Sequence, residues 1–394
     1  MSKEKILINV SGPDKPGITH QLLSVIDKAN CQVCDLGQSV THGLLSLSIF
    51  IELGIEDKEY PVIKDLLFSA KKLGMELDFK IYDKNDSLPK QSTERFILNC
   101  VSTQTIPTGF IKEISGTLSR NNVNILRLDT TNPLKFSSLE IITTIPPKLS
   151  VDDLKAELLE ISNKFSVDAA FLKDNIWRRN KRLIVFDMDS TLIQSEVIDE
   201  MAKDHGVEDR VSEITESAMN GELDFNESLI RRVSMLEGLE EKKLSEILDR
   251  LEYTKGAKEF ISAVKKLGYK VALISGGFTF FANALKEKLG LDYAFANELE
   301  IKDGKLTGKV TGTIINAEQK ATLLKLITQQ EKLQIEQVVA IGDGANDLPM
   351  LSTAGLGIAY HAKDIVRKKA GHHMSHGPMT TILHFLGVDD PNFL

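Results

Sequence analysis

The chain has 394 residues, of which 42% are hydrophobic and 26% charged, and its formal net charge is −8 at pH 7. This length predicts two or three domains, and this composition excludes disordered and fibrous proteins. The acidic balance argues against a nucleic-acid or membrane partner, because such partners usually require a basic surface. The three cysteines form no disulfide framework, and no segment resembles a signal sequence or a membrane span, so we expect a cytoplasmic protein.

Residues 1–84 predict a βαββαβ order, which gives a ferredoxin-like α+β domain with an antiparallel sheet and both helices on one face. The first strand, over residues 3–10, runs into a loop rich in turn residues that contains Gly12, Asp14 and Gly17. The later predicted elements are a helix from about Ile18 to Ile26, two strands within 31–53, a helix at about 62–73 and a strand at about 75–82.

Residues 93–174 predict a second domain with the same order. Val101 stands where Val10 stands in the first copy, which is 91 residues earlier. The strands, the two helices and the final strand follow at matching positions. Exposed edges of two such sheets invite pairing with another chain, so we expect a homodimer.

The loop from Gly12 to Gly17 resembles that of the ACT domain family, a βαββαβ module that in many amino-acid enzymes binds a small amino acid. The resemblance implies that L-serine or another amino acid binds at Gly12, Asp14 and Gly17 and regulates the protein. The glycines would let backbone N–H groups approach a carboxylate, although a tight turn without a ligand fits the same residues. The second copy lacks the Asp-Lys-Pro-Gly part of this loop, so we expect it to share the fold and not the ligand.

Residues 181–394 predict an α/β domain with a doubly wound, parallel, Rossmann-like sheet whose site lies at the carboxyl ends of the strands. A basic run at 175–182 precedes it and is predicted to be a solvated connector. A segment at about 196–254 has helical patterning alone, which predicts an inserted helical cap. Short apolar strands are predicted at 183–186, 270–274, 337–341 and 355–359, with a hairpin within 298–315.

Four polar features follow predicted strands or open the helices after them. They are Asp187 with Asp189, the run Ser275-Gly276-Gly277 at the predicted start of a helix, Lys320, and Asp343 with Asp347. Each feature alone is weak, because acid pairs, glycine turns and single lysines are common. In this order they resemble the four motifs of the haloacid dehalogenase superfamily of phosphotransferases, and the insertion resembles its helical caps.

The resemblance implies hydrolysis of a phosphate monoester with Mg2+ as the cofactor. Asp187 would be the nucleophile that forms an aspartyl-phosphate, and Asp189 the general acid and base. Ser275, Gly276 and Lys320 would hold the phosphoryl oxygens, and Lys320 would also pair with Asp187. The metal ligands would be Asp187, the backbone carbonyl of Asp189 and Asp343, with Asp347 in support.

In the cap, Glu196 comes seven residues after Asp189, and the run from Met219 to Leu229 leads to Arg231 and Arg232. This pattern resembles the phosphoserine phosphatase family of that superfamily. The resemblance implies that Glu196 pairs with the substrate ammonium group, Arg232 binds its carboxylate, and Phe225 closes over its side chain. Arg suits a planar carboxylate because its guanidinium group is a bidentate donor. Met219 and Asn346 complete the implied substrate site. Glu196 could instead be a favourable acid in the first turn of a helix, Phe225 ordinary core of the cap, and Arg231 the ligand in place of Arg232.

The implied activity is hydrolysis of O-phospho-L-serine to L-serine, the last step of L-serine biosynthesis, with ACT domains for regulation. A phosphatase or phosphotransferase for phosphothreonine or phosphohomoserine is one alternative. An amino-acid-sensing regulatory protein with a vestigial phosphatase is another, although the complete set of motif residues argues against it.

Overall fold

The computed structural model forms two compact units, Met1–Gln91 and Ser92–Leu394, which are taken one at a time. The described residues are 4–53, 61–82, 94–130, 137–219 and 223–388. Among these residues no helix combines the length and the apolar character that a membrane crossing requires.

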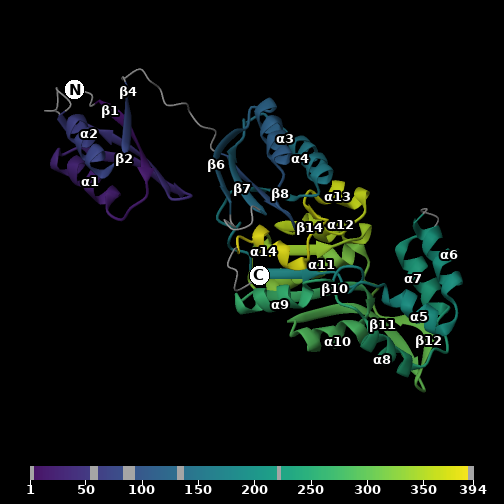
Figure 1. Ribbon diagram of the computed structural model, residues 1–394. Helices are drawn as coiled ribbons and strands as arrows, with labels where there is room; N and C mark the ends of the chain where they lie inside the picture. Colours follow the sequence, from purple (N-terminus) through teal and green to yellow (C-terminus); the bar gives the residue numbers. More distant parts are fainter. Residues whose placement is uncertain (1–3, 54–60, 83–93, 131–136, 220–222, 389–394) are drawn as a thin grey trace. The chain divides into compact units, whose positions relative to one another are not determined.

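The first unit, coloured purple in Figure 1, has the predicted βαββαβ order, and its strands lie in the spatial order β2-β3-β1-β4. Its elements are β1 Lys5–Pro13, α1 Ile18–Lys28, β2 Gln32–Thr41, β3 Leu44–Glu52, α2 Pro61–Leu73 and β4 Glu76–Tyr82. Alternate residues of β1, namely Ile6, Ile8 and Val10, are buried in one core with residues of both helices. His42 and Gly43 both have positive φ angles, as the two-residue turn between β2 and β3 requires.

A second βαββαβ sheet, in the order β6-β7-β5-β8, begins the second unit. Its elements are β5 Arg95–Val101, α3 Thr108–Arg120, β6 Asn124–Thr130, β7 Ser138–Thr144, α4 Val151–Phe165 and β8 Asp168–Lys173. Both copies therefore confirm the predicted ferredoxin-like topology. The second sheet packs on the α/β part of its unit, because Val101 and Ala170 belong to the same buried core as Phe186.

One buried carboxylate fixes that packing. Asp168, at the start of β8, is 1% exposed and accepts backbone hydrogen bonds from Ser375, His376 and Gly377 at 2.7, 3.1 and 3.1 Å. These donors lie near the C-terminal end of the described chain. The second copy is therefore anchored to a loop that is about 200 residues away in sequence.

The large sheet has seven strands in the order β12-β11-β10-β9-β13-β14-β15. The strands are β9 Leu183–Phe186, β10 Lys270–Phe278, β11 Tyr293–Lys302, β12 Lys305–Thr311, β13 Val338–Gly342, β14 Leu356–Tyr360 and β15 His373–Met374. All neighbours are parallel except β11 and β12, so the sheet is mixed and not wholly parallel. The hairpin predicted as a separate excursion is this antiparallel edge, and β11 also pairs in parallel with β10.

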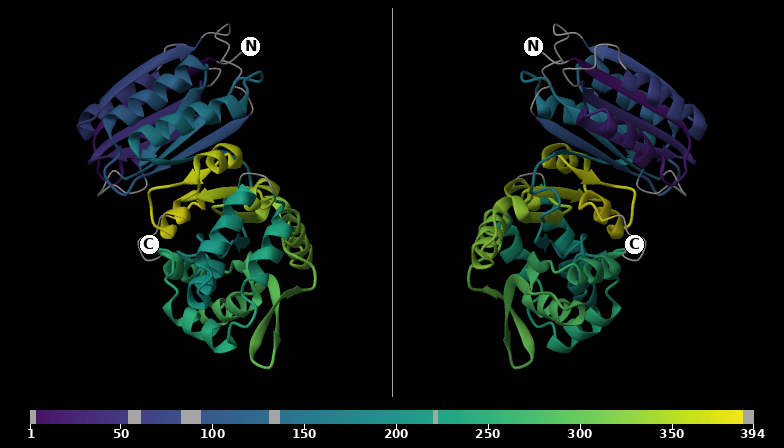
Figure 2. Two further views of the ribbon diagram at one scale, coloured as in Figure 1. Left: turned by 90° about the vertical axis from the view of Figure 1, so that its right-hand side faces the viewer. Right: turned by 90° about the vertical axis from the view of Figure 1, so that its left-hand side faces the viewer.

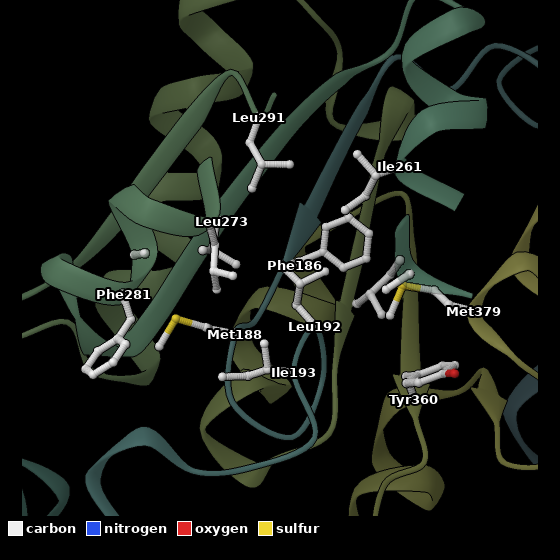
Figure 3. Packing of buried hydrophobic residues seen from close by; sticks show 14 of the residues in the cluster. Phe186, Met188, Leu192, Ile193, Ile261, Leu273, Phe281, Leu291, Tyr360 and Met379 are labelled. Atoms are coloured by element: carbon white, nitrogen blue, oxygen red, sulfur yellow. The ribbon is translucent and has the colours of Figure 1, made fainter. Parts of the chain in front are cut away.

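Helices cover the large sheet and complete the doubly wound fold. They are α9 Ala257–Lys266, α10 Thr279–Leu289, α11 Ala317–Gln330, α12 Leu348–Thr353, α13 Asp364–Ala370 and α14 Ile382–Phe385. Strand β9 lies between β10 and β13, and all four of its residues are fully buried. Figure 3 shows Phe186 of this strand against Leu273 of β10 and Ile261 of α9.

The sequence predicted that the basic run before β9 is a solvated connector, and this prediction is wrong. Arg178 and Lys181 are each 6% exposed. Arg178 forms an ion pair with Glu140 of β7, and the Lys181 ammonium group donates to the backbone carbonyl of Glu336. The run instead joins the second βαββαβ sheet to the large sheet.

The predicted cap is present as helices α5 Val197–His205, α6 Glu208–Met219, α7 Phe225–Ser234 and α8 Glu241–Arg250. The chain enters and leaves it through two adjacent segments, where Thr254 donates to the carbonyl of Leu192 and Ile193 pairs with Tyr253. Leu306 of β12 exchanges backbone hydrogen bonds with Gly238 and Leu239. Figure 2 shows the hairpin, in light green, extending beside the teal cap helices.

Candidate active site

The central strand β9 delivers Asp187 to the middle of the carboxyl edge of the large sheet. The Asp187 N–H donates to the carbonyl of Ile341 in β13 at 2.9 Å, so the residue continues the pairing of β9 beyond its last residue. Because β10 and β13 flank β9, the segments that follow those strands meet at Asp187. This topology brings together motif residues that are as many as 160 positions apart.

Lys320 forms a buried ion network with two aspartates. Its ammonium nitrogen lies 2.7 Å from Asp187 Oδ1 and 2.7 Å from Asp347 Oδ1, and Lys320 and Asp347 are fully buried. Burial alone would lower the pKa of Lys320, but the two carboxylates raise it above its ordinary value. Lys320 is therefore a buried, permanently charged cation and not a solvated surface lysine.

Asp187, Asp343 and Asp347 form a group of carboxylates that fits a divalent cation. One oxygen from each of the three lies within 4.8 Å of the others. Burial, and then the charge of Asp347, raises the pKa of Asp187 to about 8 and that of Asp343 to about 6. A hard cation bound by oxygen ligands would offset this crowding of negative charge.

Two of these carboxylates, Asp343 and Asp347, also accept hydrogen bonds from neighbouring residues. Thr191 donates its hydroxyl hydrogen to Asp343 Oδ1 at 2.8 Å. Asp347 Oδ2 accepts the Gly344 N–H at 3.0 Å, while its Oδ1 faces Lys320. Both oxygens of Asp347 therefore have partners, which suits a supporting position beside a metal more than a direct one.

Asp189 does not belong to this group of three carboxylates, and its carboxyl oxygens have partners of their own. Its Oδ1 accepts the Val197 N–H at 3.0 Å, and its Oδ2 lies 3.5 Å from Ser275 Oγ. Burial, and then the charges of Glu196 and Asp187, raises the pKa of Asp189 well above its ordinary value. A buried carboxyl group that keeps its proton can donate it, and this is the property of a general acid.

Ser275, Gly276 and Gly277 lie in a bulge of β10, and not at the start of a helix as the sequence predicted. Strand β10 continues to Phe278, and its register with β11 shifts between Ile274 and Phe278. Ser275 Oγ accepts the Gly277 N–H at 2.8 Å. A Cβ atom on Gly277 would come within 2.7 Å of Asp189 Oδ2, so this position requires glycine.

Glu196 precedes α5 as its N-cap residue and faces Asp189 from the cap side. Its Oε1 accepts the Ser190 hydroxyl hydrogen at 2.9 Å, and Ser190 has a left-handed backbone with φ 55°. The residue as a whole is exposed, but enough protein surrounds its carboxyl group that burial raises the pKa. The Ser190 hydrogen bond opposes that rise.

The structure distinguishes between the two candidate arginines of α7. Arg231 is exposed and pairs with Glu227 on its own helix. Arg232 is half-buried, and its Nε atom is buried with no hydrogen-bond partner among the described residues. Burial lowers the pKa of its guanidinium group, whereas the negative charges of Asp199 and Glu196 act to raise that pKa. Arg232 therefore faces the acidic side of the site with unused donor capacity.

Phe225, at the start of α7, packs over the bulge of β10. A Cβ atom on Gly276 would lie 3.0 Å from the ring of Phe225, so the ring and the glycine are in direct contact. Asn346 is half-buried between Asp343 and Asp347, and its Oδ1 lies beside Gly344. Met219 is the last residue of α6, and its side chain falls outside the described residues.

Sequence reasoning assigned no role to three residues that contact or face this site. Thr191 and Ser190 lie in the first motif, but their hydroxyl partners depend on segments that only the fold brings close. Asp199 follows Glu196 by three residues on α5, and its charge acts on Arg232. This spacing places both acids on one helix face, so the signal was available in the sequence.

The proposed amino-acid site of the first unit is an exposed loop. Gly12 and Gly17 have positive φ angles of 155° and 92°, and Asp14 donates its N–H to the carbonyl of Gly43 at 2.8 Å. A Cβ atom on Gly12 would meet the Met75 sulfur at 2.8 Å. The positive φ angles and the close contact with Met75 thus explain the glycines without a ligand. Ligand binding at this loop stays a prediction.

Comparison with known proteins agrees with this geometry. The profile of the haloacid dehalogenase-like hydrolases matches residues 184–352, and that of the ACT domain matches residues 4–80. A phosphoserine phosphatase of Mycobacterium tuberculosis is 36% identical over 98% of this chain and 94% of its own length. A phosphoserine phosphatase of Saccharomyces cerevisiae is 40% identical over 75% of this chain and 97% of its own.

Solved structures give the same relationship. A HAD family hydrolase of Salmonella enterica covers 75% of this chain and 99% of its own, with 34% identity and a TM-score of 0.64. A phospho-aspartyl intermediate analogue of phosphoserine phosphatase covers 52% of this chain and 99% of its own, with 47% identity and a TM-score of 0.50. The chain belongs to the phosphoserine phosphatase family of haloacid dehalogenase-like hydrolases.

Proposed function

We propose that this chain catalyses the Mg2+-dependent hydrolysis of O-phospho-L-serine to L-serine and phosphate, the last step of L-serine biosynthesis. The observation that carries the proposal is the pairing of two groups of residues across one site. Asp187, Lys320 and Asp343 suit a phosphoryl group, and Glu196 and Arg232 suit the two charges of an amino acid. The names of the relatives support the same substrate.

The metal would be held by Asp187 and Asp343, with Asp347 in support and the backbone carbonyl of Asp189 as a further ligand. The close oxygens and raised pKa values of Asp187 and Asp343 fit a hard divalent cation. When bound, Mg2+ would neutralise charge on the phosphate dianion, which otherwise repels a carboxylate nucleophile.

Asp187 acts as the nucleophile in the first step. A carboxylate oxygen of Asp187 forms a bond to phosphorus as the bond between phosphorus and the serine oxygen breaks, which leaves an aspartyl-phosphate. Lys320 holds the Asp187 carboxylate at 2.7 Å and is a fixed cation for the transferring group. The solved analogue of a phospho-aspartyl intermediate in a related phosphoserine phosphatase supports this step.

Asp189 carries the proton in both steps. Burial raises the pKa of Asp189, which favours the protonated form that can donate to the departing serine oxygen. In the second step its carboxylate takes a proton from water, the water oxygen bonds to phosphorus, and the bond to Asp187 breaks. Ser275 and the N–H of Gly276 would hold the phosphoryl oxygens during both steps.

The cap side selects the amino acid. Glu196 binds the substrate ammonium group and Arg232 binds its carboxylate. The buried Nε of Arg232, which has no partner in the part of the chain that the structure describes, then gains an acceptor. Phe225 closes over the short side chain above Gly276, and we assign Met219 and Asn346 to the same binding site by the family resemblance. Phosphothreonine and phosphohomoserine share both charges, and they are the main competing substrates.

Regulation and assembly are the remaining parts of the proposal. The first βαββαβ unit binds L-serine or another amino acid at Gly12, Asp14 and Gly17. Strand β2 is an edge strand with all ten residues exposed, which favours a homodimer formed through such an edge. A regulatory protein with a vestigial phosphatase is the second candidate, but the intact ion network of Lys320 argues against decay.

A turnover panel tests the proposal. Phosphate release is measured on O-phospho-L-serine, O-phospho-L-threonine, O-phospho-L-homoserine and p-nitrophenyl phosphate, with Mg2+ or with a chelator, and with or without L-serine. We expect the highest kcat/KM on O-phospho-L-serine, no turnover with the chelator, and a phosphorylated peptide containing Asp187 after acid quench. A higher kcat/KM on another phosphoamino acid would make that ester the substrate in place of O-phospho-L-serine. If no phosphate is released in the presence of Mg2+, the regulatory protein with a vestigial phosphatase is favoured.

A further inference from the structure

Asn297 is a buried polar residue of β11 that none of the four motifs contains. It is 1% exposed and belongs to the strand beside β10. Its side-chain amide makes two hydrogen bonds, both to backbone groups and both in segments that carry active-site residues. A buried amide with this pair of partners calls for an explanation beyond packing.

The first hydrogen bond fixes the bulge of β10. Asn297 Nδ2 donates to the carbonyl of Gly276 at 2.7 Å. The register of β10 with β11 shifts between Ile274 and Phe278, so three residues of β10 stand against one of β11 and the regular ladder is interrupted. The Asn297 side chain therefore replaces the partner that the Gly276 carbonyl would have in an unbroken sheet.

The second hydrogen bond reaches the segment before Lys320. Asn297 Oδ1 accepts the Ile315 N–H at 2.8 Å. The next residue, Asn316, is the N-cap of α11, and its carbonyl accepts the N–H of Lys320 at 2.9 Å. Because one partner is an acceptor and the other a donor, only one orientation of the amide satisfies both.

We propose that Asn297 is a positioning residue for the phosphoryl site, because it joins the Ser275–Gly277 bulge to the start of the helix that carries Lys320. The inference rests on the proposed function of those two segments. With its carbonyl bonded to Asn297, Gly276 has a fixed peptide orientation, and Ser275 and Lys320 keep a constant separation. Both hydrogen bonds of the Asn297 side chain go to backbone groups of these segments, so its proposed role is exerted through them.

Substitution of Asn297 tests this role on two esters and on phosphate itself. For Asn297→Ala we expect kcat to fall about 10- to 100-fold on both O-phospho-L-serine and p-nitrophenyl phosphate, because the phosphoryl group is common to them. The affinity for inorganic phosphate, measured by calorimetry with Mg2+ present, falls about tenfold for the same reason. A variant that melts at a lower temperature but keeps wild-type kcat and phosphate affinity overturns the proposal.

Asn297→Asp gives a readout that a purely structural role would not move. At high pH its carboxylate has no hydrogen for the Gly276 carbonyl, and at low pH the protonated acid restores a donor. We expect the ratio of variant to wild-type kcat to rise as the pH is lowered from 8 to about 5.5. A ratio that is constant with pH contradicts the assigned hydrogen bond, and it decides the matter if Asn297→Ala fails to fold.

Asn99→Asp is the matched control. Asn99 is 4% exposed, but it lies on the second βαββαβ sheet beside Arg178. We expect a lower melting temperature with unchanged kcat and phosphate affinity for the folded enzyme. A drop in phosphate affinity equal to that of Asn297→Ala would show a general effect of destabilisation and overturn the proposal. If wild-type enzyme cleaves neither ester, the proposed function fails, while phosphate affinity still decides the role of Asn297.

Discussion

The two sides of the active site are built in opposite ways. The phosphoryl floor, defined as Asp187, Lys320, Asp343 and Asp347, is crowded and holds itself together through ion pairs at 2.7 Å. The cap wall, defined as Glu196, Phe225 and Arg232, is more open, and Arg232 has a buried nitrogen with no partner among the described residues. The groups that we propose for the chemistry are thus satisfied by one another, whereas those that we propose to select the substrate keep binding capacity for it.

The largest test of this contrast is Asp187→Asn. The floor should serve every phosphate ester, so we expect kcat to fall at least about 10,000-fold on both O-phospho-L-serine and p-nitrophenyl phosphate. Phosphate release in single-turnover and steady-state assays measures the loss. The exposed Asp249→Asn is the control and should retain full activity. Residual turnover above about one part in a hundred would remove Asp187 as the nucleophile.

Lys320→Met should damage the floor in stability as well as in activity. It leaves Asp187 and Asp347 buried without their cation, which costs about 3 kcal/mol of folding free energy and lowers kcat about 1,000-fold on both esters. Denaturant unfolding without added metal measures the first effect. Lys325→Met, on the exposed face of the same helix, should change neither. Equal stability of both variants would contradict a floor held by ion pairs.

Arg232→Ala should separate the cap wall from the floor. We expect kcat/KM on O-phospho-L-serine to fall about 100-fold, because a bidentate pair with the substrate carboxylate is lost. Activity on p-nitrophenyl phosphate, which has no such carboxylate, should stay within about threefold. The neighbouring Arg231→Ala is the matched control, since Arg231 pairs with Glu227 instead. Equal losses on the two esters would place Arg232 in the floor.

The smallest expected effect is the pH dependence of metal binding to the floor. Without metal, the raised pKa values of Asp187, about 8, and Asp343, about 6, mean that protons occupy these carboxylates as the pH falls. Protons then compete with Mg2+, so its apparent affinity should weaken by up to about tenfold per pH unit between pH 8 and pH 6. Calorimetric titration of Mg2+ at several pH values measures this, and a constant affinity would contradict it.

The sequence predicted the elements that rest on local patterns. The apolar run at 183–186 is β9, and the helix periodicity around Leu22 and Leu244 is present as buried faces of α1 and α8. The positions of Asp187, Ser275, Lys320 and Asp343 around one point followed from the rule that parallel strands present their carboxyl ends at one edge. Local pattern, topology and the resemblance to the four superfamily motifs together predicted the residues of the floor.

What the sequence missed depends on partners that are distant along the chain. Ser275-Gly276-Gly277 looks like a turn into a helix, but Asn297, which has no recognisable motif, holds it in a strand bulge. Charge alone indicated that Arg178 would be solvated, yet Glu140 of β7 pairs with it in a buried site. Such pairings depend on tertiary structure, and no local propensity encodes them.

The anchor at Asp168 has a consequence for how the chain is made. Its three backbone donors, in residues 375–377, leave the ribosome more than 200 residues after Asp168 itself. The apolar residues Val101 and Ala170 share a core with residues as late as Leu386, so that core is incomplete until this part of the chain is made. A truncation before residue 375 therefore removes more than a terminal loop, because it leaves the second βαββαβ sheet with an apolar face open to aggregation throughout the life of the protein.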